Sequence, residues 1–133
     1  IKLSFIGDID SMPEHAKEGI SKCINETKNL NDFELIVALN YGAIWDIVNA
    51  VKDAKIKNED LNEDNFLEFT QLGTEEIDIF IRTGGDMRLS NFLLANIGYS
   101  ELFFTEKLWP EFESKDLLEI IQEFTKRQRR FGQ

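Results

Sequence analysis

The sequence has little cysteine, histidine and proline, and it has no long apolar run. Its 133 residues include one cysteine, one histidine and two prolines. A single cysteine, Cys23, excludes an internal disulfide, so nothing calls for an oxidising compartment and we expect a cytoplasmic protein. The lone histidine, His15, has no second histidine or cysteine at ligand spacing, which argues against a metal role for it. Because no apolar run reaches about 18 residues, any membrane contact is expected to be peripheral, at the inner face.

Positive charge is also scarce. Lys and Arg number 15 against 25 Asp and Glu, which gives a net charge of -10 at pH 7. Nucleic acids are bound by accumulated positive charge, so this balance argues against a nucleic-acid partner. The exception is the basic C-terminus, with Lys126, Arg127, Arg129 and Arg130. Its simplest interpretation is a helix end stabilised by cations.

The length fits a single globular domain, and the order of its patterns predicts the fold class. Short apolar runs alternate with segments of helical periodicity, which predicts an α/β fold with a mainly parallel sheet and helices on both faces. The second apolar run is almost uninterrupted, so we expect it to be buried on both faces. Expected strands cover residues 2–6, 33–40, 77–81 and 101–105, and expected helices begin near Pro13, Ala43 (with Trp45, Val48, Val51 and Ala54 or neighbours inward), Ser90 and Ser114.

The most informative stretch is residues 77–94. An apolar run delivers Arg82 at the end of a strand, Gly84-Gly85 permits a tight turn, and Arg88 and Ser90 open a segment that we expect to be helical. Free N–H groups at a helix N-terminus and two guanidinium groups favour a phosphate or diphosphate. On these residues alone, an ordinary turn with surface ion pairs remains an alternative.

Longer strings within the chain resemble a known family. Residues 81–94, 99–105 and 108–112 read IRTGGDMRLSNFLL, YSELFFT and LWPEF. They closely resemble the signature of the cis-prenyltransferases, and most of all the undecaprenyl diphosphate synthases. The resemblance covers essentially the whole chain. It implies Mg2+-dependent condensation of isopentenyl diphosphate with an allylic diphosphate such as farnesyl diphosphate, giving a polyprenyl diphosphate, the precursor of a lipid carrier for the cell wall.

The resemblance also implies a role for individual residues. Arg82, Arg88 and Ser90, together with Leu89, match positions that hold the diphosphate of isopentenyl diphosphate. Glu101 matches a position that helps to bind magnesium. Arg82, Arg88 and Glu101 are therefore the candidate catalytic residues. Since ligands sit beyond the carboxyl ends of strands in open α/β sheets, we expect Arg82 and Glu101 to share one site there.

Two further parts of the chain bear on the resemblance. Arg130 and Gly132 match a terminal Arg-x-Gly element that reaches across a homodimer to the partner's diphosphate, so a homodimer is expected. Asp86 stands where glutamate is more usual. Met87 stands where some members have histidine, so this chain has no proton relay through that position.

The family's N-terminal signature, Met-Asp-Gly-Asn-x-Arg-Trp with its essential aspartate, has no counterpart in this sequence. We therefore expect residues 1–133 to be the C-terminal part of a single catalytic domain, inactive by itself. Two alternatives remain open. One is a non-catalytic family subunit that completes a partner's site, and the other is an inactive fragment with an anion-binding turn.

Overall fold

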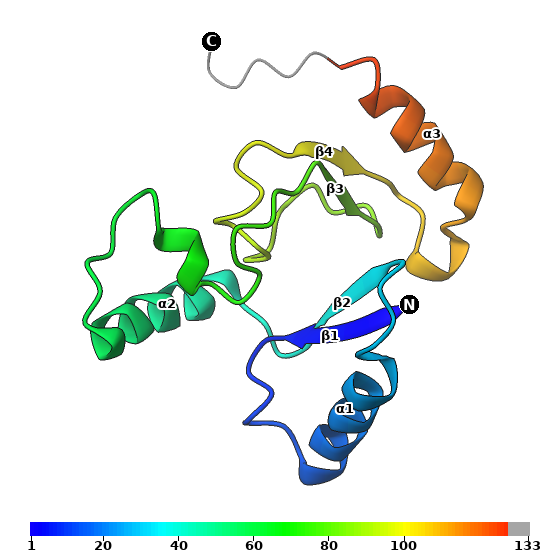
Figure 1. Ribbon diagram of the computed structural model, residues 1–133. Coiled ribbons are helices and arrows are strands. Elements are labelled where there is room, and N and C mark those ends of the chain that lie inside the picture. The colour runs from blue at the N-terminus through cyan, green and yellow to red at the C-terminus, as the bar shows by residue number, and fades with distance from the viewer. Residues whose placement is uncertain (128–133) are drawn as a thin grey trace. The chain divides into compact units, whose positions relative to one another are not determined.

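The computed structural model describes residues 1–127, and the chain forms two compact units, Ile1–Thr74 and Glu75–Gln133. Figure 1 shows their helices and strands. The α/β class is confirmed, because each unit pairs parallel strands and carries helices. The parallel strands form two pairs, one in each unit. Within the described residues no helix is both long and apolar enough to cross a membrane.

The first unit is a strand–helix–strand motif followed by two further helices. Strand β1 pairs with β2 in parallel, with Lys2 opposite Glu34 and Ile6 opposite Ala38. Two parallel neighbours need a long crossover connection, which α1 supplies, and α1 packs against β1 (Figure 1). The elements are β1 (Lys2–Ile6), α1 (Glu14–Thr27), β2 (Glu34–Ala38), α2 (Ala43–Lys57) and the 3-10 helix η1 (Phe66–Phe69).

Burial in this unit differs from two expectations. Leu35 and Ile36 of β2 are 46% and 38% exposed, so the strand is not buried on both faces. Within this unit β2 pairs with β1, and it is β1 against which α1 packs. In α2 the valines at 48 and 51 are exposed, and the buried apolar positions are small alanines: Ala43, Ala50 and Ala54.

A buried carboxylate holds the turns of the first unit together. Asp46 is 2% exposed; its Oδ2 accepts the Tyr41 hydroxyl at 2.8 Å and its Oδ1 accepts the Gln71 N–H at 3.0 Å. Burial, and then the bond to Asp46, raises the pKa of Tyr41. The Gln71 side chain in turn accepts the N–H of Gly7. Gly7 has φ of +116°, and a Cβ there would lie 1.8 Å from the Leu39 carbonyl oxygen, so the turn requires glycine.

The second unit is built on a shorter parallel pair. Its core is apolar and includes Phe80 and Phe103, and the Phe80 ring contacts that of Phe104 at 6.2 Å between centroids. The elements are β3 (Ile79–Arg82), β4 (Glu101–Phe104), the 3-10 helix η2 (Trp109–Glu111) and α3 (Ser114–Phe124).

The helix expected to begin near Ser90 is absent, and a series of turns joins β3 to β4. Ser90, Asn91 and Leu93 have φ of 47°, 60° and 46°, and a right-handed helix does not tolerate left-handed backbone at these positions. The apolar pattern was nevertheless informative, because Leu93 and Ile97 are buried. Phe92 and Leu94, the other two apolar residues expected to face inward, are 38% and 36% exposed, so the pattern predicted burial only in part and the backbone conformation wrongly.

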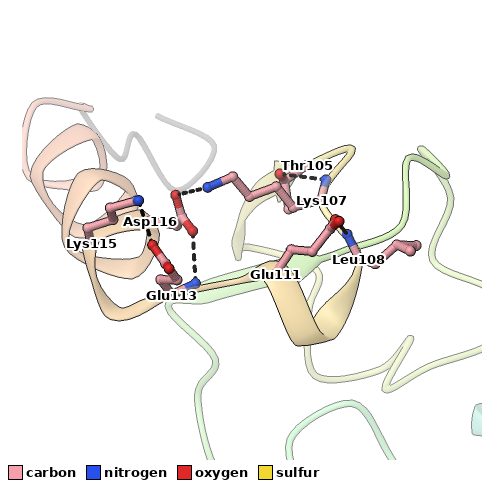
Figure 2. A network of polar contacts seen from close by, with 7 residues as sticks. All are labelled: Thr105, Lys107, Leu108, Glu111, Glu113, Lys115 and Asp116. Carbon is pink, nitrogen blue, oxygen red and sulfur yellow. Dashed lines mark hydrogen bonds and ion pairs between the residues drawn. The ribbon is translucent and has the colours of Figure 1, made fainter.

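Polar contacts hold the N-terminus of α3, and Figure 2 shows them. The cap is Glu113 rather than the expected Ser114, which is the first helical residue. Asp116 accepts the Glu113 N–H at 2.8 Å and pairs with Lys107 Nζ at 2.6 Å. Lys107, and then the Glu113 N–H, hold the pKa of Asp116 below its usual value. The first turn of α3 is therefore fastened to the loop that leaves β4.

Candidate functional site

The structure brings three of the expected diphosphate-binding residues together around Asp86. Arg82 Nη2 lies 2.9 Å from Asp86 Oδ2, and Arg88 Nη2 lies 2.7 Å from Asp86 Oδ1. Arg82 Nη1 also donates to the Ser90 hydroxyl at 2.5 Å and to the Arg88 carbonyl. We call Arg82, Asp86, Arg88 and Ser90 the arginine cluster. Sequence reasoning noted Asp86 only as a departure from the family, although the alternation of charge over residues 82–88 signalled an ion-pair network.

The arginine cluster is accessible and carries net positive charge. The side chains of Arg82, Asp86 and Arg88 are 23%, 44% and 68% exposed. Two guanidinium groups face one carboxylate, so the cluster has an excess of one positive charge. Ion pairs this exposed contribute about 0–1 kcal/mol each, so an entering anion can displace them.

The glycine turn contributes shape rather than hydrogen-bond donors. Gly84 donates its N–H to the Lys107 carbonyl at 2.8 Å, and Gly85 donates to the Thr105 carbonyl at 2.9 Å. Because β3 and β4 are parallel, the residues after β4 run beside the turn after β3, and both glycine N–H groups are already bonded. The free N–H groups that we expected were those of a helix N-terminus, and the helix expected near Ser90 is absent. These two N–H groups are therefore not available to an anion.

A cavity of about 410 Å³ adjoins the cluster. Two cluster residues, Arg82 and Ser90, line it, and so does Leu89, the fourth expected substrate-binding residue. The remaining lining is mostly apolar, and a site with a charged part and an apolar part suits an amphipathic anion. The apolar residues are Ile77, Ile79, Phe80, Ile81, Phe92, Leu93 and Ile97.

Glu101 does not join the arginine cluster. It lies opposite Ile79, at the amino end of β4, whereas Arg82 lies opposite Phe104 at the carboxyl end of the pair. At the usual rise per strand residue the two positions are about 10 Å apart along the strands. The expectation that Arg82 and Glu101 both lie beyond the carboxyl ends of strands is wrong, because the first residue of a parallel strand is at the opposite edge.

Arg127 holds the Glu101 carboxylate instead. Its Nη1 lies 2.7 Å from Glu101 Oε2, and its guanidinium carbon lies 4.1 Å from the centroid of the buried Phe103 ring. The bonds to Glu101 and then Glu123 raise the pKa of Arg127. Sequence reasoning assigned Arg127 only to the basic end of a helix. Arg130 and Gly132 lie outside the described residues.

A magnesium ion at Glu101 would need ligands from elsewhere. Over residues 1–127, no group of three or more His, Cys, Asp or Glu side chains could hold a metal ion. One carboxylate is a normal protein contribution to a Mg2+ site when phosphate oxygens and water supply the rest. The arginine cluster of the same unit is too far along the strands to present such a phosphate.

Comparisons with known proteins agree with one another. The family model described as putative undecaprenyl diphosphate synthase matches residues 1–132. A tritrans,polycis-undecaprenyl-diphosphate synthase (geranylgeranyl-diphosphate specific) of Pyrobaculum aerophilum is 41% identical over 99% of this chain and 58% of its own length. A ditrans,polycis-undecaprenyl-diphosphate synthase ((2E,6E)-farnesyl-diphosphate specific) of Photorhabdus laumondii is 39% identical over 99% of this chain and 55% of its own.

A solved structure gives the same result. The crystal structure of a probable undecaprenyl diphosphate synthase from Campylobacter jejuni superposes with a TM-score of 0.93 at 34% identity, over 99% of this chain and 63% of that one. The chain thus spans somewhat more than half the length of the curated relatives it matches.

Proposed function

Since this chain belongs to the undecaprenyl diphosphate synthase family of prenyltransferases, we propose that the protein containing it is a cis-prenyltransferase that condenses isopentenyl diphosphate with an allylic diphosphate. The observation that carries the proposal is the arginine cluster beside a largely apolar cavity. Such a site matches a diphosphate joined to a short hydrocarbon. Residues 1–133 are proposed to form part of one catalytic domain.

The reaction requires the alkene of isopentenyl diphosphate to meet the allylic carbon. The allylic C1–O bond breaks and releases inorganic diphosphate, C4 of isopentenyl diphosphate bonds to C1, and one proton leaves C2. The new chain keeps the diphosphate of isopentenyl diphosphate. Arg82, Arg88 and Ser90 hold that diphosphate through charge-assisted hydrogen bonds and so orient the alkene, which is a contribution from proximity.

Magnesium is part of the proposal, with Glu101 as its ligand. When bound, Mg2+ neutralises the charge of diphosphate oxygens. The Glu101 carboxylate is 23% exposed, and Arg127 fixes its orientation through one oxygen, Oε2. The remaining ligands would be phosphate oxygens and water, and the phosphate would not be the one held at the arginine cluster, which lies at the other end of the strands.

Farnesyl diphosphate is the proposed allylic substrate and an undecaprenyl-type polyprenyl diphosphate the product. The two relatives compared above carry names that specify different allylic diphosphates, so this choice needs a direct measurement. We further propose a cytoplasmic homodimer at the inner face of the membrane, in which Arg130 and Gly132 complete the partner's site.

Product formation tests the proposal. The full-length protein is incubated with radiolabelled isopentenyl diphosphate, Mg2+ and either farnesyl or geranylgeranyl diphosphate, and butanol-extractable product is counted against a reaction without allylic substrate. We expect long-chain product with farnesyl diphosphate. Binding of isopentenyl diphosphate without product from either allylic substrate would instead indicate a non-catalytic subunit. If the protein neither binds isopentenyl diphosphate nor forms product, the proposed site is contradicted.

A further inference from the structure

Asp86 pairs with the same two arginines that the diphosphate is proposed to bind. Its two carboxylate oxygens contact one arginine each, Oδ2 with Arg82 and Oδ1 with Arg88. We propose that Asp86 is a displaceable counter-anion: it gives up both arginines when a diphosphate binds and pairs with them again as the diphosphate leaves. This inference rests on the proposed function of the arginine cluster.

The contact resembles the one a phosphate would make. A phosphate group offers guanidinium side chains two oxygens on one central atom, and the Asp86 carboxylate offers the same arrangement to the same two side chains. A diphosphate and Asp86 cannot both keep these contacts without placing like charges side by side. Binding of one therefore weakens the hold of the other.

The local structure lets Asp86 move without loss of the turn. The Asp86 side chain is 44% exposed and that of Arg88 is 68% exposed, so water can replace each contact as it breaks. The preceding turn is fixed separately, because Gly84 and Gly85 donate to the carbonyls of Lys107 and Thr105. Displacement of Asp86 thus needs only a side-chain rotation.

The proposed reaction gives this exchange a purpose. Each condensation leaves the lengthened chain with the diphosphate that came from isopentenyl diphosphate, so this diphosphate starts in the arginine cluster. It must leave before the next isopentenyl diphosphate can bind. Two guanidinium groups without a counter-charge would hold the product in place, whereas Asp86 takes over both contacts as the product departs. Asp86 therefore speeds release at the cost of affinity.

The test measures binding and release with Asp86→Asn, which keeps the shape and removes the charge. Isopentenyl diphosphate is titrated into the full-length protein without Mg2+ by calorimetry, and its dissociation rate is measured by stopped flow. We expect Asp86→Asn to bind up to about tenfold more tightly and to release more slowly, the scale of two lost exposed ion pairs. Asp86→Glu should behave as the wild type does. Asp64→Asn, the same charge change at an exposed position of the first unit, should change neither quantity.

A second measurement follows the products. With farnesyl diphosphate and Mg2+, Asp86→Asn should accumulate chains of intermediate length, because each release step is slower, and a merely structural role would lower the amount of product without shortening it. Weaker or unchanged binding in Asp86→Asn would overturn the inference and leave the proposed function standing. If Arg82→Ala and Arg88→Ala also leave binding unchanged, the cluster is not the diphosphate site and the proposed function fails with the inference.

Discussion

Arg82 and Glu101 lie at opposite ends of one pair of parallel strands. Glu101 is opposite Ile79, three residues before Arg82 in β3. The family resemblance assigns both side chains to one reaction, but within this unit they lie in two separate sites. Their contacts differ accordingly, since Arg82 pairs with Asp86 and Glu101 pairs with Arg127. This separation makes their roles separately testable.

The arginine substitutions should weaken one substrate selectively. In the full-length protein, Arg82→Ala and Arg88→Ala should each weaken the binding of isopentenyl diphosphate by roughly 1.5–3 kcal/mol, the scale of lost charge-assisted hydrogen bonds. The KM for isopentenyl diphosphate should rise accordingly. Arg82 should give the larger effect, because its side chain is 23% exposed against 68% for Arg88. Steady-state kinetics with each substrate varied in turn measure this. An equal loss for the allylic substrate would show that the site is misassigned.

Glu101→Gln should change the metal requirement and leave metal-free substrate binding alone. The substitution removes a charge from the proposed Mg2+ site while keeping the side chain's size, so activity should need more Mg2+. Glu123→Gln is the matched control, because Glu123 also pairs with Arg127 but is not a proposed metal ligand. A Mg2+ titration of activity compares the two variants. An identical Mg2+ dependence in wild type and Glu101→Gln would remove Glu101 from the metal site.

The Lys107–Asp116 pair should stabilise the start of α3 in a pH-dependent way. Lys107, and then the Glu113 N–H, lower the pKa of Asp116, so its contribution is present above the unfolded-state pKa and is lost as pH falls through the folded-state value. Asp116→Asn should therefore speed amide hydrogen exchange in the first turn of α3 near neutral pH. The difference from wild type should shrink in acid.

A neighbouring surface pair supplies the control for Asp116 (Figure 2). Lys115 lies 2.5 Å from Glu113, with side chains 68% and 59% exposed, so Lys115→Met should have little effect. Equal effects of Lys115→Met and Asp116→Asn on exchange would mean that the Lys107 contact adds nothing.

Two glycine substitutions should change the free energy of unfolding in opposite directions. Gly7→Ala places a Cβ 1.8 Å from the Leu39 carbonyl oxygen at φ of +116°, so the turn after β1 must shift and the unit should lose at least about 2 kcal/mol. Gly19 lies within α1 with nothing within 4 Å of an added Cβ. Gly19→Ala should therefore stabilise by about 0.5–1 kcal/mol. Denaturant unfolding measures both: a Gly7→Ala variant as stable as the wild type would contradict the structure around Gly7, and a destabilised Gly19→Ala variant would contradict the open space at Gly19.

Much of the local structure and chemistry could be predicted from sequence. The apolar runs located the four strands to within about two residues, and Gly84-Gly85 marked a turn with positive φ at both positions. The family was also evident from the sequence, because its motif lies within one continuous stretch. The chemistry of Arg82 and Arg88 indicated an anion site, and the family resemblance added Ser90 and the assignment to a diphosphate. The structure brings the three residues together.

The tertiary structure decided what those residues contact. Left-handed backbone at residues 90, 91 and 93 replaces the expected helix, and of its apolar residues Leu93 and Ile97 are buried whereas Phe92 and Leu94 are exposed. The glycine N–H groups bond to carbonyls of Thr105 and Lys107, about twenty residues away, which no local pattern reveals. Parallel pairing fixed Glu101 at the edge opposite Arg82. Strand direction and register depend on contacts between distant segments, whereas periodicity depends on neighbours along the chain, so the sequence determined the elements and the fold determined their partners.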